Sequence, residues 1–186
     1  QALPGPETTY SSIGQRWANV ANTPWQFWKA ESYEGGIHTP MIACWPDGIK
    51  AKKGSFNAQV GHVMDFMSTF AELAGARYPT EYKGHTIPPT PGISLVSSFS
   101  GRPAPGHEAL FNEHFGARYA REGDWKIVSR AGKDSVWRLF DLAEDGSETM
   151  DLAAKYPEKV RHLDSMWRQW ANTHYVFPKP GEKKRK

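Results

Sequence analysis

The sequence predicts a mixed α/β (α+β) fold, with an α/β part over residues 1–104 and a small antiparallel sheet packed on a C-terminal helix over residues 105–178. Three patterns predict it: helical apolar spacing over residues 61–75, four strand-like runs between residues 108 and 142, and an amphipathic stretch over residues 157–172. A sheet with one apolar face, followed by such a helix, buries that face against the helix. A basic tail, residues 179–186, follows, and we expect it to be solvated.

The composition is that of a chain with a packed core. It is 39% hydrophobic and holds eight Trp among 186 residues, which argues against disorder over most of its length. The formal charge of +3 is close to neutral and predicts no nucleic-acid partner. No apolar run is long enough for a membrane span, so we expect no membrane partner. The single cysteine, Cys44, excludes an intrachain disulfide.

The first elements are predicted from turn and capping residues. Residues 1–22 are typical of an irregular loop. Thr23 has the pattern of an N-cap, with Pro24 at the first helical position and Gln26 three residues on, which predicts a short helix ended by Gly35 and Gly36. Residues 37–45 form an apolar run that predicts a strand buried on both faces, with Cys44 as a core thiol.

The clearest helix of the first half covers residues 61–75, with Gly75 as its C-terminal cap. Its apolar side chains share one face: Val63, Phe66, Met67, Phe70, Leu73 and Ala74. Residues 78–106 are rich in Pro, Gly and Ser, which predicts a surface linker and a domain boundary near residues 100–106.

The second half changes to short strands separated by turn residues. Residues 108–115, 118–121, 125–130 and 136–142 predict an antiparallel meander. The helix over residues 157–172 begins at Pro157, and we expect Trp167 and Trp170 on its apolar stripe to lie in the core.

Four segments, in this order, resemble the C-terminal portion of the type I sulfatases (arylsulfatases) of the alkaline phosphatase superfamily. Lys29 with residues 33–36 (Tyr-Glu-Gly-Gly) and Pro40 resembles the lysine segment of that family, and residues 61–76 resemble the helix that follows it. Residues 111–128 resemble the family's C-terminal hairpin, and residues 137–153 its closing strand and loop. The resemblance implies that the first part is the incomplete edge of an alkaline-phosphatase-like α/β sandwich.

The resemblance also implies a chemistry and its residues. Lys29 would contact the sulfate of the substrate as a catalytic residue, and His114, on the hairpin, would be a substrate-binding residue or a structural histidine. For Arg118 we favour a salt bridge with a neighbouring Glu, and we interpret His38 and His62 as structural. Calcium and formylglycine are expected for the full-length enzyme. Cys44 lacks the Cys/Ser-x-Pro-x-Arg motif, and we expect no residue of this chain to bind either group.

We therefore expect a C-terminal fragment of a sulfuric ester hydrolase that acts on aryl or carbohydrate sulfates and is inactive alone, because nucleophile and metal ligands would lie upstream. Two alternatives stay open: a fragment of a related phosphonate monoester hydrolase or phosphodiesterase, and a non-catalytic binding module. The family favours a periplasmic or extracellular location. An apolar face left uncovered by truncation predicts self-association.

Overall fold

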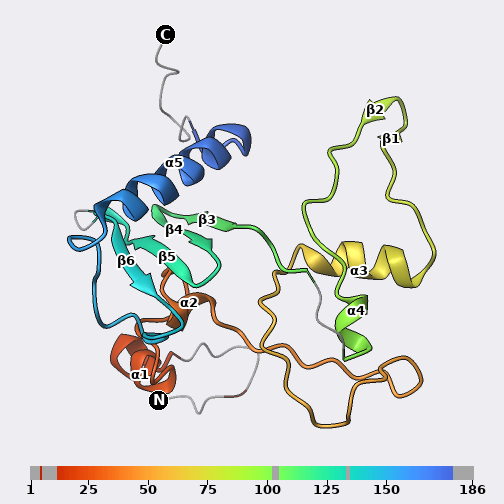
Figure 1. Cartoon of the computed structure of the whole chain (residues 1–186), viewed down its shortest axis with the longest axis horizontal. Helices are drawn as coiled ribbons and strands as arrows, with labels where there is room; N and C mark the ends of the chain where they lie inside the picture. Colours follow the sequence, from red (N-terminus) through yellow and green to blue (C-terminus); the bar gives the residue numbers. More distant parts are fainter. Residues whose placement is uncertain (1–4, 6–11, 102–104, 133–134, 178–186) are drawn as a thin grey trace. The chain divides into compact units, whose positions relative to one another are not determined.

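The computed structural model describes residue 5 and residues 12–101, 105–132 and 135–177 (Figure 1). It forms two compact units, the first from Gln1–Pro40 with Ala109–Lys186 and the second from Met41–Glu108. The domain boundary predicted between residues 104 and 105 stays a prediction. The compact units are a different division of the chain, in which the described residues up to Pro40 belong with the C-terminal sheet. The predicted basic tail lies outside the described residues.

The first unit is built on a four-stranded antiparallel sheet of order β3-β4-β5-β6. Its strands are β3 (Leu110–His114), β4 (Ala117–Glu122), β5 (Trp125–Ser129) and β6 (Arg138–Asp141). Neighbouring strands in the sheet are also neighbours in the sequence, so the predicted meander is confirmed. Phe115 and Gly116 make the two-residue turn between β3 and β4 with φ of 50° and 94°, the left-handed backbone that tight hairpins require.

Helix α5 (Pro157–Thr173) covers one face of this sheet, as predicted (Figure 1). Leu163, Trp167 and Ala171 pack against strand side chains that are almost fully buried. The indole Nε1 of Trp167 donates to the Asn112 carbonyl oxygen over 3.0 Å, so this large side chain is fixed as well as buried. Trp170 is partly buried at the edge of the same cluster. The strand residues of the cluster are Ala120, Ile127 and Leu139.

The opposite face of the sheet is covered by the chain around α2 (Glu34–Ile37). Alternate strand residues point to opposite faces, so Lys126 and Phe140 face away from α5. Phe140 meets Tyr33 there with ring centroids 5.9 Å apart, and Tyr33 is 3% exposed. The sheet is therefore buried on both faces, which the sequence pattern did not predict.

Two predictions for the N-terminal region are wrong. Residues 14–21, expected in a loop, form helix α1 (Gly14–Ala21), while the helix predicted from Thr23 is replaced by turns. The reason is visible at Phe27 and Ala30, whose φ angles of 65° and 79° cannot continue a right-handed helix. Side-chain hydrogen bonds from Asn22 stabilise this alternative path.

The second unit contains helix α3 (Asp65–Leu73), the one-turn helix α4 (Val96–Phe99), and the hairpin of β1 (Glu81–Tyr82) and β2 (His85–Thr86). The predicted helix is confirmed, and Gly75 follows its C-cap with a φ of 60°, as a C-terminal glycine should. Its apolar stripe is largely exposed, however: Phe70 is 63% exposed. The predicted linker carries α4 and the hairpin.

The strand predicted over residues 37–45 does not form. Ile42 is 94% exposed, and no described residue pairs with this segment as a strand. Backbone N–H and C=O groups need such a partner to hold a strand in place, so an apolar run alone does not make one. Cys44 is consequently exposed rather than a core thiol. Within the described part of the chain, every helix is too short or too polar to cross a membrane.

Candidate functional site

Lys29 lies at the outer end of a turn in the first unit, between α1 and α2, and its side chain is exposed. Trp25, Phe27 and Trp28 beside it are half-buried, as expected for side chains that pack this segment. The described residues leave the ammonium group of Lys29 open to solvent on this chain. An exposed ammonium on a fixed turn can present its three donors to an anion.

The backbone on both sides of Lys29 is fixed by asparagine side chains. The Nδ2 of Asn22 donates to the carbonyl oxygens of Phe27, over 2.7 Å, and Gly35, over 2.8 Å. The Phe27 N–H donates to Oδ1 of Asn19 over 2.8 Å. These bonds connect residues five to thirteen positions apart, so they close the Lys29 turn into a defined loop.

An ion pair connects the same turn to the sheet. Nη2 of Arg130, which directly follows β5, lies 2.8 Å from Oε1 of Glu31. The Arg130 guanidinium also lies over the Phe27 ring, 4.4 Å from its centroid. Lys29 is thus flanked by two residues that contact one arginine, which limits how far the turn can move.

The two glycines after the turn have a specific packing role. A Cβ on Gly35 would overlap the carbonyl oxygen of Gln26, and a Cβ on Gly36 would overlap that of Glu31. The Glu-Gly-Gly sequence therefore lets α2 pass directly against the backbone of the Lys29 turn. Glycine is required here for its size.

A buried charge cluster lies where α2 meets the sheet. Nζ of Lys126 on β5 lies 2.7 Å from Oε1 of Glu34 and 2.8 Å from Oε1 of Glu148. The Glu34 N–H donates to Oε2 of Glu148 over 2.6 Å, and Nδ1 of His38 lies 2.8 Å from Oε2 of Glu34. One ammonium is thus shared by two carboxylates in a water-excluded position, with Lys126 and Glu148 at 0% side-chain exposure.

The two carboxylates of this cluster differ in pKa. Burial raises the pKa of Glu148 above its ordinary value, and the attraction of Lys126 only partly offsets this. Burial also acts on Glu34, but Lys126 and His38 outweigh it and hold the Glu34 pKa below its ordinary value. Glu34 is therefore the carboxylate that holds its charge most firmly.

Sequence reasoning missed this cluster, although one signal was present. Lys126 stands within a strand-like run between Trp125 and Ile127, and a lysine buried in such a run needs an acidic partner. Its partners lie 92 and 22 positions away, so the sequence offered no means to choose them.

The other predicted site residues have different surroundings. His114 ends β3 beside the hairpin turn, is exposed, and has its ring centroid 4.5 Å from that of Phe115. Arg118 forms no ion pair with any described residue, against our expectation. Its guanidinium lies against the rings of Trp137, at 4.4 Å, and Trp167, at 4.8 Å. Trp137 directly precedes β6 and Trp167 comes from α5. Burial lowers the pKa of Arg118 from its ordinary value.

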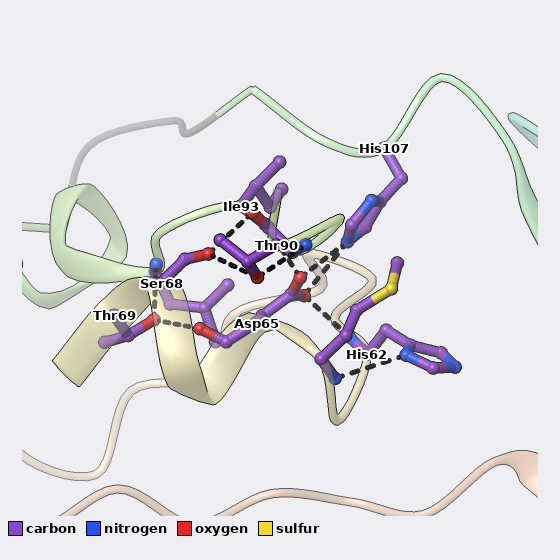
Figure 2. Close-up of polar contacts among 10 residues, drawn as sticks. His62, Asp65, Ser68, Thr69, Thr90, Ile93 and His107 are labelled. Carbon is purple, nitrogen blue, oxygen red and sulfur yellow. Dashed lines mark hydrogen bonds and ion pairs between the residues drawn. The ribbon is translucent and has the colours of Figure 1, made fainter. Parts of the chain in front are cut away.

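A second polar cluster in the second unit surrounds the fully buried Asp65 of α3 (Figure 2). Its carboxylate accepts the N–H groups of His62, over 2.7 Å, and Ile93, over 3.0 Å, and contacts Nε2 of His107 over 2.8 Å. Burial lowers the pKa of His62, which Asp65 partly offsets. Both carboxylate oxygens are occupied, so this cluster fastens residues 93 and 107 to the start of α3 and leaves no acceptor open.

The described residues contain no group of three or more His, Cys, Asp or Glu side chains arranged to hold a metal ion. Neither polar cluster therefore presents a metal-ligand set of that size.

Curated relatives of the chain are sulfatases. An uncharacterised sulfatase of Schizosaccharomyces pombe is 31% identical over 159 residues, which are 83% of this chain and 28% of the relative. Arylsulfatase K of Xenopus laevis is 29% identical over 159 residues, which are 77% of this chain and 27% of the relative. The chain belongs to the sulfatase family. It corresponds to a C-terminal portion of such proteins and spans a little over a quarter of the length of these relatives.

Solved structures agree on the fold of this sulfatase chain. A crystal structure of Ps i-CgsB in complex with k-i-k-neocarrahexaose superposes with a TM-score of 0.64 at 23% identity, covering 80% of this chain and 32% of that one. A Bacteroides thetaiotaomicron protein from work on the metabolism of multiple glycosaminoglycans gives a TM-score of 0.59 at 22% identity, covering 77% and 31%. The predicted alkaline-phosphatase-like fold is thereby confirmed. No protein-family model matches the chain.

Proposed function

We propose that this chain is the part of a sulfuric ester hydrolase that presents Lys29 to the sulfate group of an aryl or carbohydrate sulfate ester. The observation that carries the proposal is the exposed Lys29 on a turn held by Asn22, Glu31 and the glycines of α2, in the segment that resembles the family's lysine segment. The sulfatase relatives support the same enzyme class.

The chemistry requires a fixed cation at this place. As the ester bond to the sulfate group breaks, negative charge grows on the non-bridging oxygens and on the leaving oxygen. A preorganised ammonium group stabilises that charge more in the transition state than in the bound ester, and so lowers the barrier. Lys29 brings three rotatable donors, which suit the tetrahedral sulfate group. His114 would contribute a second polar contact to the substrate.

Calcium and formylglycine are implied by the family, but the described residues do not fit them. They form no metal-binding group of three or more ligands, and Cys44 lies outside a Cys-x-Pro-x-Arg motif. We propose that both groups belong to parts of the full-length protein outside this chain, and that the chain alone does not turn over sulfate esters. We also propose that the isolated chain associates with itself, and that the full-length protein works in a periplasmic or extracellular location.

The test is a substitution at Lys29 in the full-length protein. We expect Lys29→Met to lower kcat for an aryl sulfate by about 100- to 1,000-fold, the usual effect of removing one donor to developing charge. Lys52→Met, which removes another exposed lysine, is the matched control and should leave kcat unchanged. Equal rates for wild type and Lys29→Met would refute the role of Lys29. Faster hydrolysis of a phosphonate monoester than of any sulfate ester would favour the phosphonate hydrolase alternative.

A further inference from the structure

The buried charge cluster of Lys126, Glu34 and Glu148 is connected to both ends of the Lys29 turn. On the C-terminal side, Glu34 begins α2. Its carboxylate contacts Lys126, and its N–H donates to the carboxylate of Glu148. On the N-terminal side, Nε2 of Gln26 donates to the carbonyl oxygens of Ser147, over 3.1 Å, and Glu148. The chain from Gln26 to Glu34 therefore starts and ends at the loop that carries Glu148, with Lys29 near its middle.

Glu148 has an unusual backbone for this purpose. Its φ of 56° lies in the left-handed region, which non-glycine residues adopt rarely and at a cost in energy. In this conformation its side chain contacts Lys126 and the Glu34 N–H, while its own carbonyl oxygen accepts Gln26. A single strained residue thus holds the sheet, the start of α2 and the start of the Lys29 turn together.

Stability alone does not explain such a cluster. Buried ion pairs can often be replaced by apolar side chains of similar volume without loss of stability, because desolvation cancels much of their attraction. Charged hydrogen bonds differ from apolar contacts in their direction and length, which fix geometry. A site that must hold one cation in register with a substrate benefits from that rigidity.

We propose that Glu148, together with Lys126 and Glu34, is a positioning residue that sets the Lys29 turn against the sheet for sulfate-ester chemistry. The inference rests on the proposed function of Lys29, since Glu148 is buried and acts through that turn. Misplacing a reacting group by a small distance is enough to slow a reaction strongly.

The experiment is a double-mutant cycle in the full-length protein. Glu148→Gln keeps the shape and the acceptor for the Glu34 N–H but removes the charge that Lys126 contacts. We expect it to lower kcat for an aryl sulfate by about tenfold or more, with KM changed by less than about threefold. In a Lys29→Met background the same substitution should change kcat no further, because its effect passes through Lys29. Glu122→Gln, which removes the charge of an exposed glutamate paired with His162, is the matched control.

A second measurement reads the turn directly in the 186-residue chain. Amide hydrogen exchange of residues 27–34 should be faster in Glu148→Gln than in wild type, and unchanged in Glu122→Gln, while circular dichroism shows all three folded. A purely structural Glu148 would lower the melting temperature but leave kcat unchanged or add to the Lys29→Met effect, and either result overturns the proposal. Unchanged exchange over residues 27–34 overturns it independently. A Lys29→Met variant with full activity, together with faster exchange in Glu148→Gln, would refute the proposed function instead.

Discussion

Tyr119 is the buried phenol next to the charge cluster. It lies on β4, is 5% exposed, and its ring centroid lies 5.3 Å from Nζ of Lys126. Burial raises the pKa of Tyr119 to about 12, and the negative charge of Glu34 adds to this. The neutral phenol is thus favoured in the folded state, because ionisation would place a second uncompensated negative charge in the cluster.

The raised Tyr119 pKa predicts a loss of stability at high pH. Its contribution is fully present below pH 10.0, its ordinary pKa, and disappears as pH rises toward about 12, because the unfolded phenol loses its proton first. A shift of two units corresponds to roughly 3 kcal/mol of unfolding free energy. Tyrosinate absorbance during alkaline titration measures the pKa of Tyr119, which is read from the difference between the curves of wild type and Tyr119→Phe. Tyr82→Phe, at an exposed phenol, is the control and should leave the titration step near pH 12 unchanged. A Tyr119 difference curve centred near pH 10 would contradict the prediction.

Individual residues also show why the helix predicted from Thr23 does not form. Thr23, Pro24 and Gln26 have the capping pattern of a helix, yet the chain turns at Phe27 instead. Gln26 is used for another purpose, because its side chain reaches the Glu148 loop. Capping residues favour a helix only when no distant acceptor competes for the same side chain.

Among the elements, α2 depends on the absence of two side chains. Gly35 and Gly36 let its backbone lie directly against the carbonyl groups of Gln26 and Glu31. The element is a single turn, so its stability comes from packing and from the Glu34 contacts rather than from helix propensity.

Gly35→Ala should therefore disrupt this contact. The added Cβ overlaps the Gln26 carbonyl oxygen, a backbone atom that cannot move aside, and we expect a loss of about 1–3 kcal/mol in the free energy of unfolding. Gly106→Ala is the control, since a Cβ there meets no atom within 4 Å. Denaturant unfolding of the 186-residue chain measures both variants. A Gly35→Ala protein as stable as Gly106→Ala would show that the two backbones do not pack as described.

In the first unit, the elements that the sequence predicted well share one property. Each strand from β3 to β6 pairs with the next strand in the sequence, and α5 packs its apolar stripe on that sheet. The segment predicted as a strand over residues 37–45 has no strand partner among the described residues, and the prediction failed.

For the whole molecule, the largest unexplained feature is the apolar surface of the second unit. Val63, Met67 and Phe70 are 71%, 55% and 63% exposed along or beside α3. Isolated apolar side chains on a surface are ordinary, but a stripe of them on one helix is typical of a surface that is covered by another chain or domain.

We expect the isolated chain to associate through this stripe. Its mass by size-exclusion chromatography with light scattering should rise with concentration, and Phe70→Glu should reduce that rise by placing a charge in the contact. Phe115→Glu is the control, because Phe115 is 87% exposed on the hairpin of the other unit and does not belong to the stripe. A monomeric wild-type chain at every concentration would contradict the prediction.

The sequence by itself determined the sulfatase family, the order of the main elements, the C-terminal sheet with its helix, and Lys29 as the candidate residue. The elements follow from local periodicity and turn residues, which nearby positions define, whereas the family and Lys29 follow from the resemblance of short motifs to those of the sulfatases. Only the tertiary structure decided that the sheet is buried on both faces, that Arg118 lies against two indole rings, and that Lys126 joins Glu34 to Glu148. Those contacts join residues far apart in the chain, and their partners are chosen by the packing of the folded protein rather than by any local pattern.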